Sequence, residues 1–135
     1  MNKKIIIGSL VGGVVAYLVG GLLWGFLFAD FYKANVTHYY GLMIDPPNMV
    51  GIAIGNLLWS LMIALLFDRM VILDFVKGAT WGALLFFLVM SGMDLFFWAS
   101  MNLYPPNLLA VDVALNAVFG GIVGGVIALT MSKVK

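Results

Sequence analysis

Residues 78–101, GATWGALLFFLVMSGMDLFFWASM, and residues 108–131, LLAVDVALNAVFGGIVGGVIALTM, decide the fold class of this chain. Each stretch is long enough to cross a bilayer, which takes about 20 mostly apolar residues in a helix. Residues 5–29 and 49–67 meet the same criterion. The sequence therefore predicts an all-α membrane protein, with residues 1–135 forming a single domain of four transmembrane helices packed as an antiparallel bundle.

The composition supports a membrane protein. Of the 135 residues, 64% are hydrophobic and only 10% are charged, whereas a soluble domain has roughly a quarter of its residues charged. The first apolar stretch follows Lys3 and Lys4 as a signal peptide would, but its 25 residues exceed the roughly 7–15 of a signal core. We expect it to stay as a membrane helix.

Basic residues predict the orientation. Six of the seven lie at the two ends of the chain or between the second and third stretches, and only Lys33 lies on the opposite side. Because basic residues concentrate on the cytoplasmic side, both termini are expected there, in the plasma (inner) membrane. The net charge of +1 offers no field that would favour nucleic acid as a partner.

The two loops predicted on the outer side end alike. Pro46-Pro47-Asn48 opens the second helix and Pro105-Pro106-Asn107 opens the fourth, and proline suits a helix start. The repetition raises the alternative of two related helical hairpins. The first loop also carries Phe31, Tyr32, His38, Tyr39 and Tyr40. It is expected to lie in the headgroup region or, alternatively, to cover an outward-facing pocket as a lid.

Glycines spaced four apart predict close helix contacts, because this spacing flattens one helix face. The pairs expected to pack are Gly21 with Gly25, Gly51 with Gly55, and the overlapping set Gly120, Gly121, Gly124 and Gly125. Packing inside the bundle is the first interpretation. The alternative is contact with a second copy or another membrane subunit, through the glycine face of the fourth helix.

Polar side chains interrupt the apolar stretches. Asp94 follows Ser91 by three residues and Asn116 follows Asp112 by four, so each pair shares a helix face. With Asn56 they form a predicted polar layer, about 8–13 Å below the outer helix ends at 1.5 Å per residue. Carboxyl groups in hydrocarbon are costly and mark sites, pathways or helix contacts.

Three interpretations of this layer stay open. A protonated aspartate can donate to an amide or to the other carboxylate and so join the helices. The layer can bind a ligand or conduct protons. Its oxygen atoms also suit a hard cation such as Na⁺, Mg²⁺ or Ca²⁺. Asp112, nearer its helix start, owes part of its tolerance to the helix dipole, so Asp94 is the more diagnostic residue.

Enzymatic motifs are missing. The sequence before Asp94 is Ser91-Gly92-Met93 rather than the Gly-x-Gly of intramembrane aspartyl proteases, and His38 is the only histidine. The chain has no cysteine and no glutamate. We therefore expect no enzymatic activity, no cofactor and no dedicated metal centre.

The stretch GGLLWGFLF at residues 20–28 and the aromatic loop after it resemble uncharacterised small bacterial four-helix membrane proteins. The resemblance implies a bacterial inner membrane and no particular activity. The leading hypothesis is a non-enzymatic component that binds a partner, lipid or small ligand through the polar layer. The alternative is a proton- or cation-coupled transporter or channel that uses Asp94 and Asp112.

Overall fold

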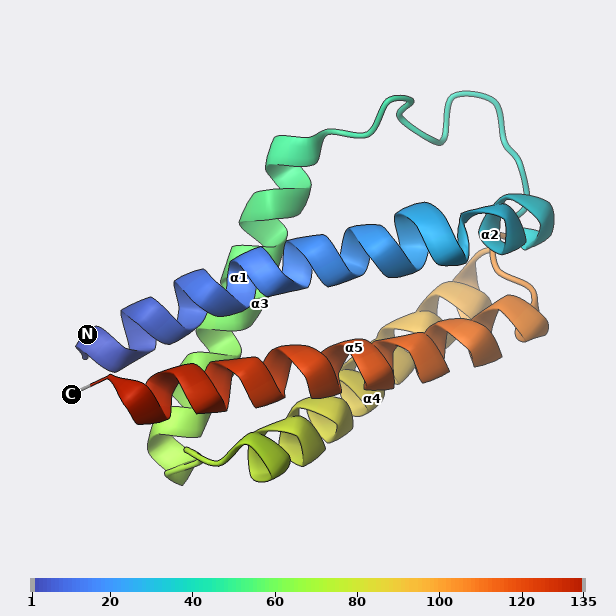
Figure 1. Cartoon of the computed structure of the whole chain (residues 1–135). Coiled ribbons are helices and arrows are strands. Elements are labelled where there is room, and N and C mark those ends of the chain that lie inside the picture. Colours follow the sequence, from blue (N-terminus) through green and yellow to red (C-terminus); the bar gives the residue numbers. More distant parts are fainter. Residues whose placement is uncertain (1, 135) are drawn as a thin grey trace.

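The computed structural model describes residues 2–134 and is helical, with no strand in that range. The elements are α1 (Lys3–Leu22), the π-helical turn η1 (Leu23–Leu27), α2 (Ala29–Asn35), α3 (Met49–Met70), α4 (Phe75–Ser100) and α5 (Pro106–Lys133), shown in Figure 1. The predicted all-α class is confirmed.

Four helices of residues 2–134 are long and apolar enough to cross a membrane: Lys3–Leu27, which joins α1 and η1, and α3, α4 and α5. The shortest, α3, has 22 residues and is about 33 Å long at 1.5 Å per residue, enough for a hydrocarbon core of about 30 Å. Each of the four predicted spans corresponds to one of these helices, with ends that differ by a few residues.

The most extensive helix contact joins α4 to α5. At its centre Gly78 and Gly82 of α4 meet Gly120 and Gly124 of α5: a Cβ atom added to Gly82 would lie 2.9 Å from the Cα of Gly124. No side chain fits between backbones this close. At one end of this helix contact, the aromatic ring of Phe75 lies against Gly125. The contact therefore depends on glycine on both helices.

The helix α1 packs against α3 and α5. Gly12 faces the side chains of Ile127 and Ser60, and a Cβ atom added there would lie 2.7 Å from Ile127 Cδ1. The fully buried side chains of the core include Ile63, Phe67 and Ile127. The two termini lie at the same end of the molecule (Figure 1), where Lys4 Nζ and Asp68 Oδ1 form an ion pair at 2.7 Å.

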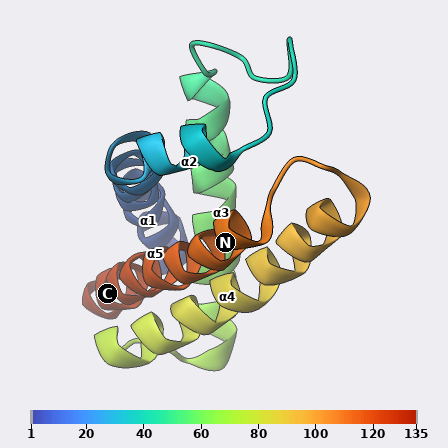
Figure 2. The same ribbon diagram turned by 90° about the vertical axis from the view of Figure 1, so that its right-hand side faces the viewer.

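The helix α3 departs from a simple bundle. It crosses α1 steeply, and its N-terminal half projects away from the other helices (Figures 1 and 2). Although only four residues separate α3 from α4, these two helices diverge. As a result an added Cβ atom would meet nothing within 4 Å at Gly21, Gly25 or Gly55. These three glycines therefore do not pack against another helix within residues 2–134, and they are open to contact with lipid or with another chain.

Candidate binding site

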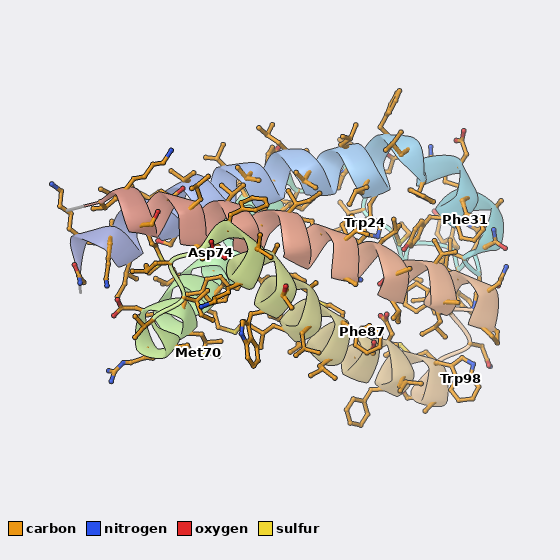
Figure 3. The ribbon with its side chains drawn as sticks, turned by 60° about the horizontal axis from the view of Figure 1, so that its bottom comes forward. Trp24, Phe31, Met70, Asp74, Phe87 and Trp98 are labelled. Carbon is orange, nitrogen blue, oxygen red and sulfur yellow. The ribbon has the colours of Figure 1, made fainter. Side chains whose placement is uncertain are left out.

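The π-helical turn η1 places the first component of the site. The backbone N–H of Phe28 donates to the carbonyl of Leu23 at 2.9 Å, a bond across five residues that widens the helix. Such turns occur frequently at functional sites. Here the wider turn carries Trp24, which lies beside α5 (Figure 3). Its ring meets Phe119 edge-on at a centroid distance of 5.5 Å, so the indole is fixed in orientation.

Asp112 of α5 is the centre of a hydrogen-bond network. Its Oδ1 accepts from Trp24 Nε1 at 2.9 Å and from the hydroxyl of Tyr32. Its Oδ2 accepts from Asn116 Nδ2 at 2.6 Å. Three neutral donors on η1, α2 and α5 thus surround one carboxyl group. Hydrogen bonds to a charged acceptor are stronger than neutral ones, so the network stabilises Asp112 without a basic residue.

A cavity of about 80 Å³ lies between α2, α4 and α5. We call it the Asp94–Asp112 cavity; its lining residues are Tyr32, Asp94, Phe97, Tyr104, Leu108, Leu109 and Asp112. The Oδ2 atom of Asp94 is buried and has no hydrogen-bond partner within residues 2–134. Buried polar atoms are nearly always paired, so this oxygen is the unexplained group of the site.

Two tyrosines outside the membrane spans add hydroxyl groups. Burial raises the pKa of Tyr32 well above its ordinary value, and the hydrogen bond to Asp112 raises it further. Burial also raises the pKa of Tyr104, with a smaller contribution from the nearby carboxyl group of Asp112. Both hydroxyls therefore keep their protons at neutral pH and can donate toward the carboxyl groups.

The structure brings three residues of the predicted polar layer together: Asp94, Asp112 and Asn116. It places the other two elsewhere. Asn56 donates to the carbonyl of Ile52 at 2.9 Å on its own helix and lines an apolar groove with Gly21 and Gly25. Ser91 lines a different groove, with Trp98 and Leu109.

Sequence reasoning did not assign Trp24, Tyr32 or Tyr104 to the site. Trp24 lies 88 residues from Asp112 and Tyr32 lies 80 residues from it, so no helical periodicity connects them. One signal was present in the sequence: a tyrosine or tryptophan at the end of a span needs a hydrogen-bond partner for its polar group when it is buried.

Comparison with protein-family models, curated proteins and solved structures found no match for this chain. Function is therefore inferred from the chemistry of the site alone.

Proposed function

We propose that this chain is a non-enzymatic integral membrane protein that binds a small ligand at the Asp94–Asp112 cavity. The observation that carries the proposal is the buried, unpaired Oδ2 of Asp94, which belongs to a residue that lines the cavity. Leaving a buried polar oxygen unpaired costs roughly 1–3 kcal/mol, and more for a charged group. A ligand that supplies a positive charge or a donor removes this cost.

The size of the cavity limits the ligand. Its 80 Å³ hold about two or three water molecules at ~30 Å³ each, while drug-sized ligands need about 300–1,000 Å³. A small cation with its remaining water, or one cationic group of a larger molecule, fits. Asp112 already accepts hydrogen bonds from three side chains, so the ligand is proposed to contact the unpaired oxygen of Asp94.

A second candidate is proton- or cation-coupled transport. The feature that favours it is a pair of carboxyl groups beside one cavity inside the predicted spans, since ionisable groups in spans frequently mark ion and proton pathways. Transport requires release on both sides of the membrane, whereas binding does not. The two functions therefore differ in whether ions or protons cross the membrane by way of Asp94.

The membrane and its sidedness belong to the same proposal. The bias of basic residues toward one side and the position of both termini at one end (Figure 1) support cytoplasmic termini in a bacterial inner membrane. The site then lies in the outer half of the bilayer. A second copy of the chain or another membrane subunit is the proposed macromolecular partner, along α3 and the open face of α1.

The binding test is a thermal-unfolding screen of the purified protein in lipid nanodiscs. Na⁺, K⁺, Mg²⁺, Ca²⁺ and tetramethylammonium are each titrated. A ligand at about 100 times its Kd stabilises the folded state by about 2.7 kcal/mol. We expect at least one cation to stabilise the wild type and to lose this effect in Asp94→Asn.

The matched control is Asp45→Asn, which removes the same charge from an exposed position of the outer loop. It should respond to cations as the wild type does. An unchanged midpoint with every cation, or an equal shift in Asp94→Asn, would refute the binding site. Ion and proton flux in liposomes then separates the candidates: flux that Asp94→Asn abolishes supports transport, and its absence supports binding alone.

A further inference from the structure

One short helix closes the Asp94–Asp112 cavity at the outer end of the bundle. Figure 2 shows α2 at this end, beside the connection between α4 and α5. From α2 only Tyr32 lines the cavity, while the rest of the lining comes from α4, α5 and their connection. Removing α2 would therefore take away one wall, one donor to Asp112 and the bond from Trp24 Nε1 to the Tyr32 hydroxyl, whereas the other two donors to Asp112, Trp24 and Asn116, belong to η1 and α5.

Polar contacts attach α2 and the residues after it to the opposite connection. Asn107 Nδ2 donates to Asn35 Oδ1 at 2.6 Å, and the backbone N–H of Thr37 donates to the carbonyl of Leu103 at 3.0 Å. Together with the Tyr32–Asp112 bond and a bond from the Tyr39 hydroxyl to the carbonyl of Asn102, they form a row of four contacts across the opening.

Apolar burial of α2 is partial. Tyr32 is half-buried and packs against the core, but no residue of α2 is fully buried, in contrast to the core of α5, where Val123 and Ile127 have at most 1% of their surface exposed. Segments with few buried contacts and exposed hydrogen bonds open at low free energy while the core stays folded. The segment therefore has the properties of a separately moving unit.

Both ends of this unit have backbone positions suited to a hinge. Phe28, between η1 and α2, leaves helical geometry with φ −111° and ψ 7°. Gly41 has φ +74°, a conformation that glycine adopts without strain. Residues 40–50 are all exposed. Rotation at these two points would move residues 29–39 without moving a transmembrane helix.

We propose that residues 29–39 form a lid over the Asp94–Asp112 cavity, latched by the hydrogen bond from Tyr32 to Asp112, and that opening this lid admits the ligand. The significance of the lid rests on the proposed binding function. The motion of the lid does not depend on that function, because the cavity can open in the absence of a ligand. The structure corresponds to the closed state, in which the latch is made.

The chain has no cysteine, so an introduced cysteine provides the only thiol in the protein. The rate at which this thiol reacts reports how accessible its position is. Leu108→Cys places a thiol on the cavity wall, where the native side chain is 1% exposed. Val123→Cys places one at an equally buried core position of the same helix. Tyr40→Cys provides a fully exposed reference. The measurement is the rate of labelling by a charged, water-soluble methanethiosulfonate reagent in nanodiscs, with and without Tyr32→Phe.

We expect the thiol at position 108 to react far more slowly than that at position 40. Tyr32→Phe should raise the labelling rate at position 108 at least about tenfold, since the hydrogen bond from Tyr32 to Asp112 is lost. It should leave the labelling rate at position 123 unchanged. An equal rate with and without Tyr32→Phe would overturn the latch. An increase in the labelling rate at positions 108 and 123 alike would also overturn the latch, because it would indicate a general loosening of the structure.

Hydrogen exchange provides a second measurement that needs no buried substitution. Asn35→Cys with Asn107→Cys, joined by a short bis-thiol crosslinker, should slow amide exchange in α2 at least tenfold relative to the uncrosslinked pair, while α5 beyond position 119 keeps its rate. No slowing in α2 would contradict the lid. Labelling that depends on Tyr32, combined with no cation effect in the binding screen, would refute the binding function and leave the lid intact.

Discussion

At the scale of single residues, the two aspartates have different roles. Asp112 accepts hydrogen bonds from Trp24, Tyr32 and Asn116, whereas Asp94 has a buried oxygen with no partner in residues 2–134. The Asp112–Asn116 contact could be predicted, because a spacing of four residues places both on one helix face. The contacts from Trp24 and Tyr32 could not, because they join distant parts of the chain and depend on a π-helical turn.

This difference predicts opposite effects on stability. Asp112→Asn should lower the free energy of unfolding by about 1.5–3 kcal/mol, because the donors around it lose a charged acceptor. Asp94→Asn should leave it unchanged or raise it, because an unpaired carboxyl oxygen is replaced. Thermal unfolding in detergent measures both. Equal losses in the two variants would contradict the assignment of separate roles.

The raised pKa of Tyr32 predicts a loss of stability at alkaline pH. The unfolded chain releases this proton near the ordinary pKa of 10.0, whereas the folded protein retains it. The contribution is therefore complete below pH 10 and is lost as the pH rises above it, by less than about 1.4 kcal/mol per pH unit for a half-exposed group. Unfolding midpoints measured from pH 8 upward should fall less steeply in Tyr32→Phe than in the wild type.

At the scale of the elements, glycine determines how closely helices approach. The spacing of Gly120 and Gly124 indicated a close contact, and the structure places that contact against α4 inside the chain. The partner glycines Gly78 and Gly82 have the same spacing, although sequence reasoning did not single them out. Because a glycine face looks the same whichever helix covers it, the pattern alone does not distinguish contact within a chain from contact between chains.

Two leucine substitutions separate packed from open glycines. Gly124→Leu should destabilise the protein by about 3 kcal/mol or more, because the added side chain meets the α4 backbone. Gly21→Leu should change stability by less than about 0.5 kcal/mol, because a Cβ atom there meets nothing within 4 Å. Unfolding of both variants in the same detergent is the measurement. Equal effects would refute the observed α4–α5 contact.

At the scale of the whole molecule, the number of spans followed from the sequence and the direction of α3 did not. Apolar runs define spans because the bilayer core requires them. The crossing of α3 over α1 is not encoded in the same way, because faces toward lipid and faces toward other helices are both apolar. The long exposed face of α3, which includes Val50, Ile54 and Leu58, therefore looks the same in sequence as a packed one.

The bias of basic residues predicts the sidedness of the whole molecule. Reporter fusions after Lys135 and within residues 40–47 should give opposite results: a cytoplasmic reporter active at the C-terminus and an externally active reporter in the loop. Fusion after Arg69 should behave like the C-terminal one. A loop fusion that reports the cytoplasmic side would invert the orientation, and would move the Asp94–Asp112 cavity to the inner half of the membrane.

The most direct test of the binding site is infrared difference spectroscopy of the carboxyl groups in nanodiscs, with and without saturating amounts of the small cations in the binding screen. We predict that one cation changes the carboxyl bands of the wild type and of Asp45→Asn, and that the change disappears in Asp94→Asn. Carboxyl bands that stay the same with every cation, or a change that persists in Asp94→Asn, would contradict a ligand at Asp94.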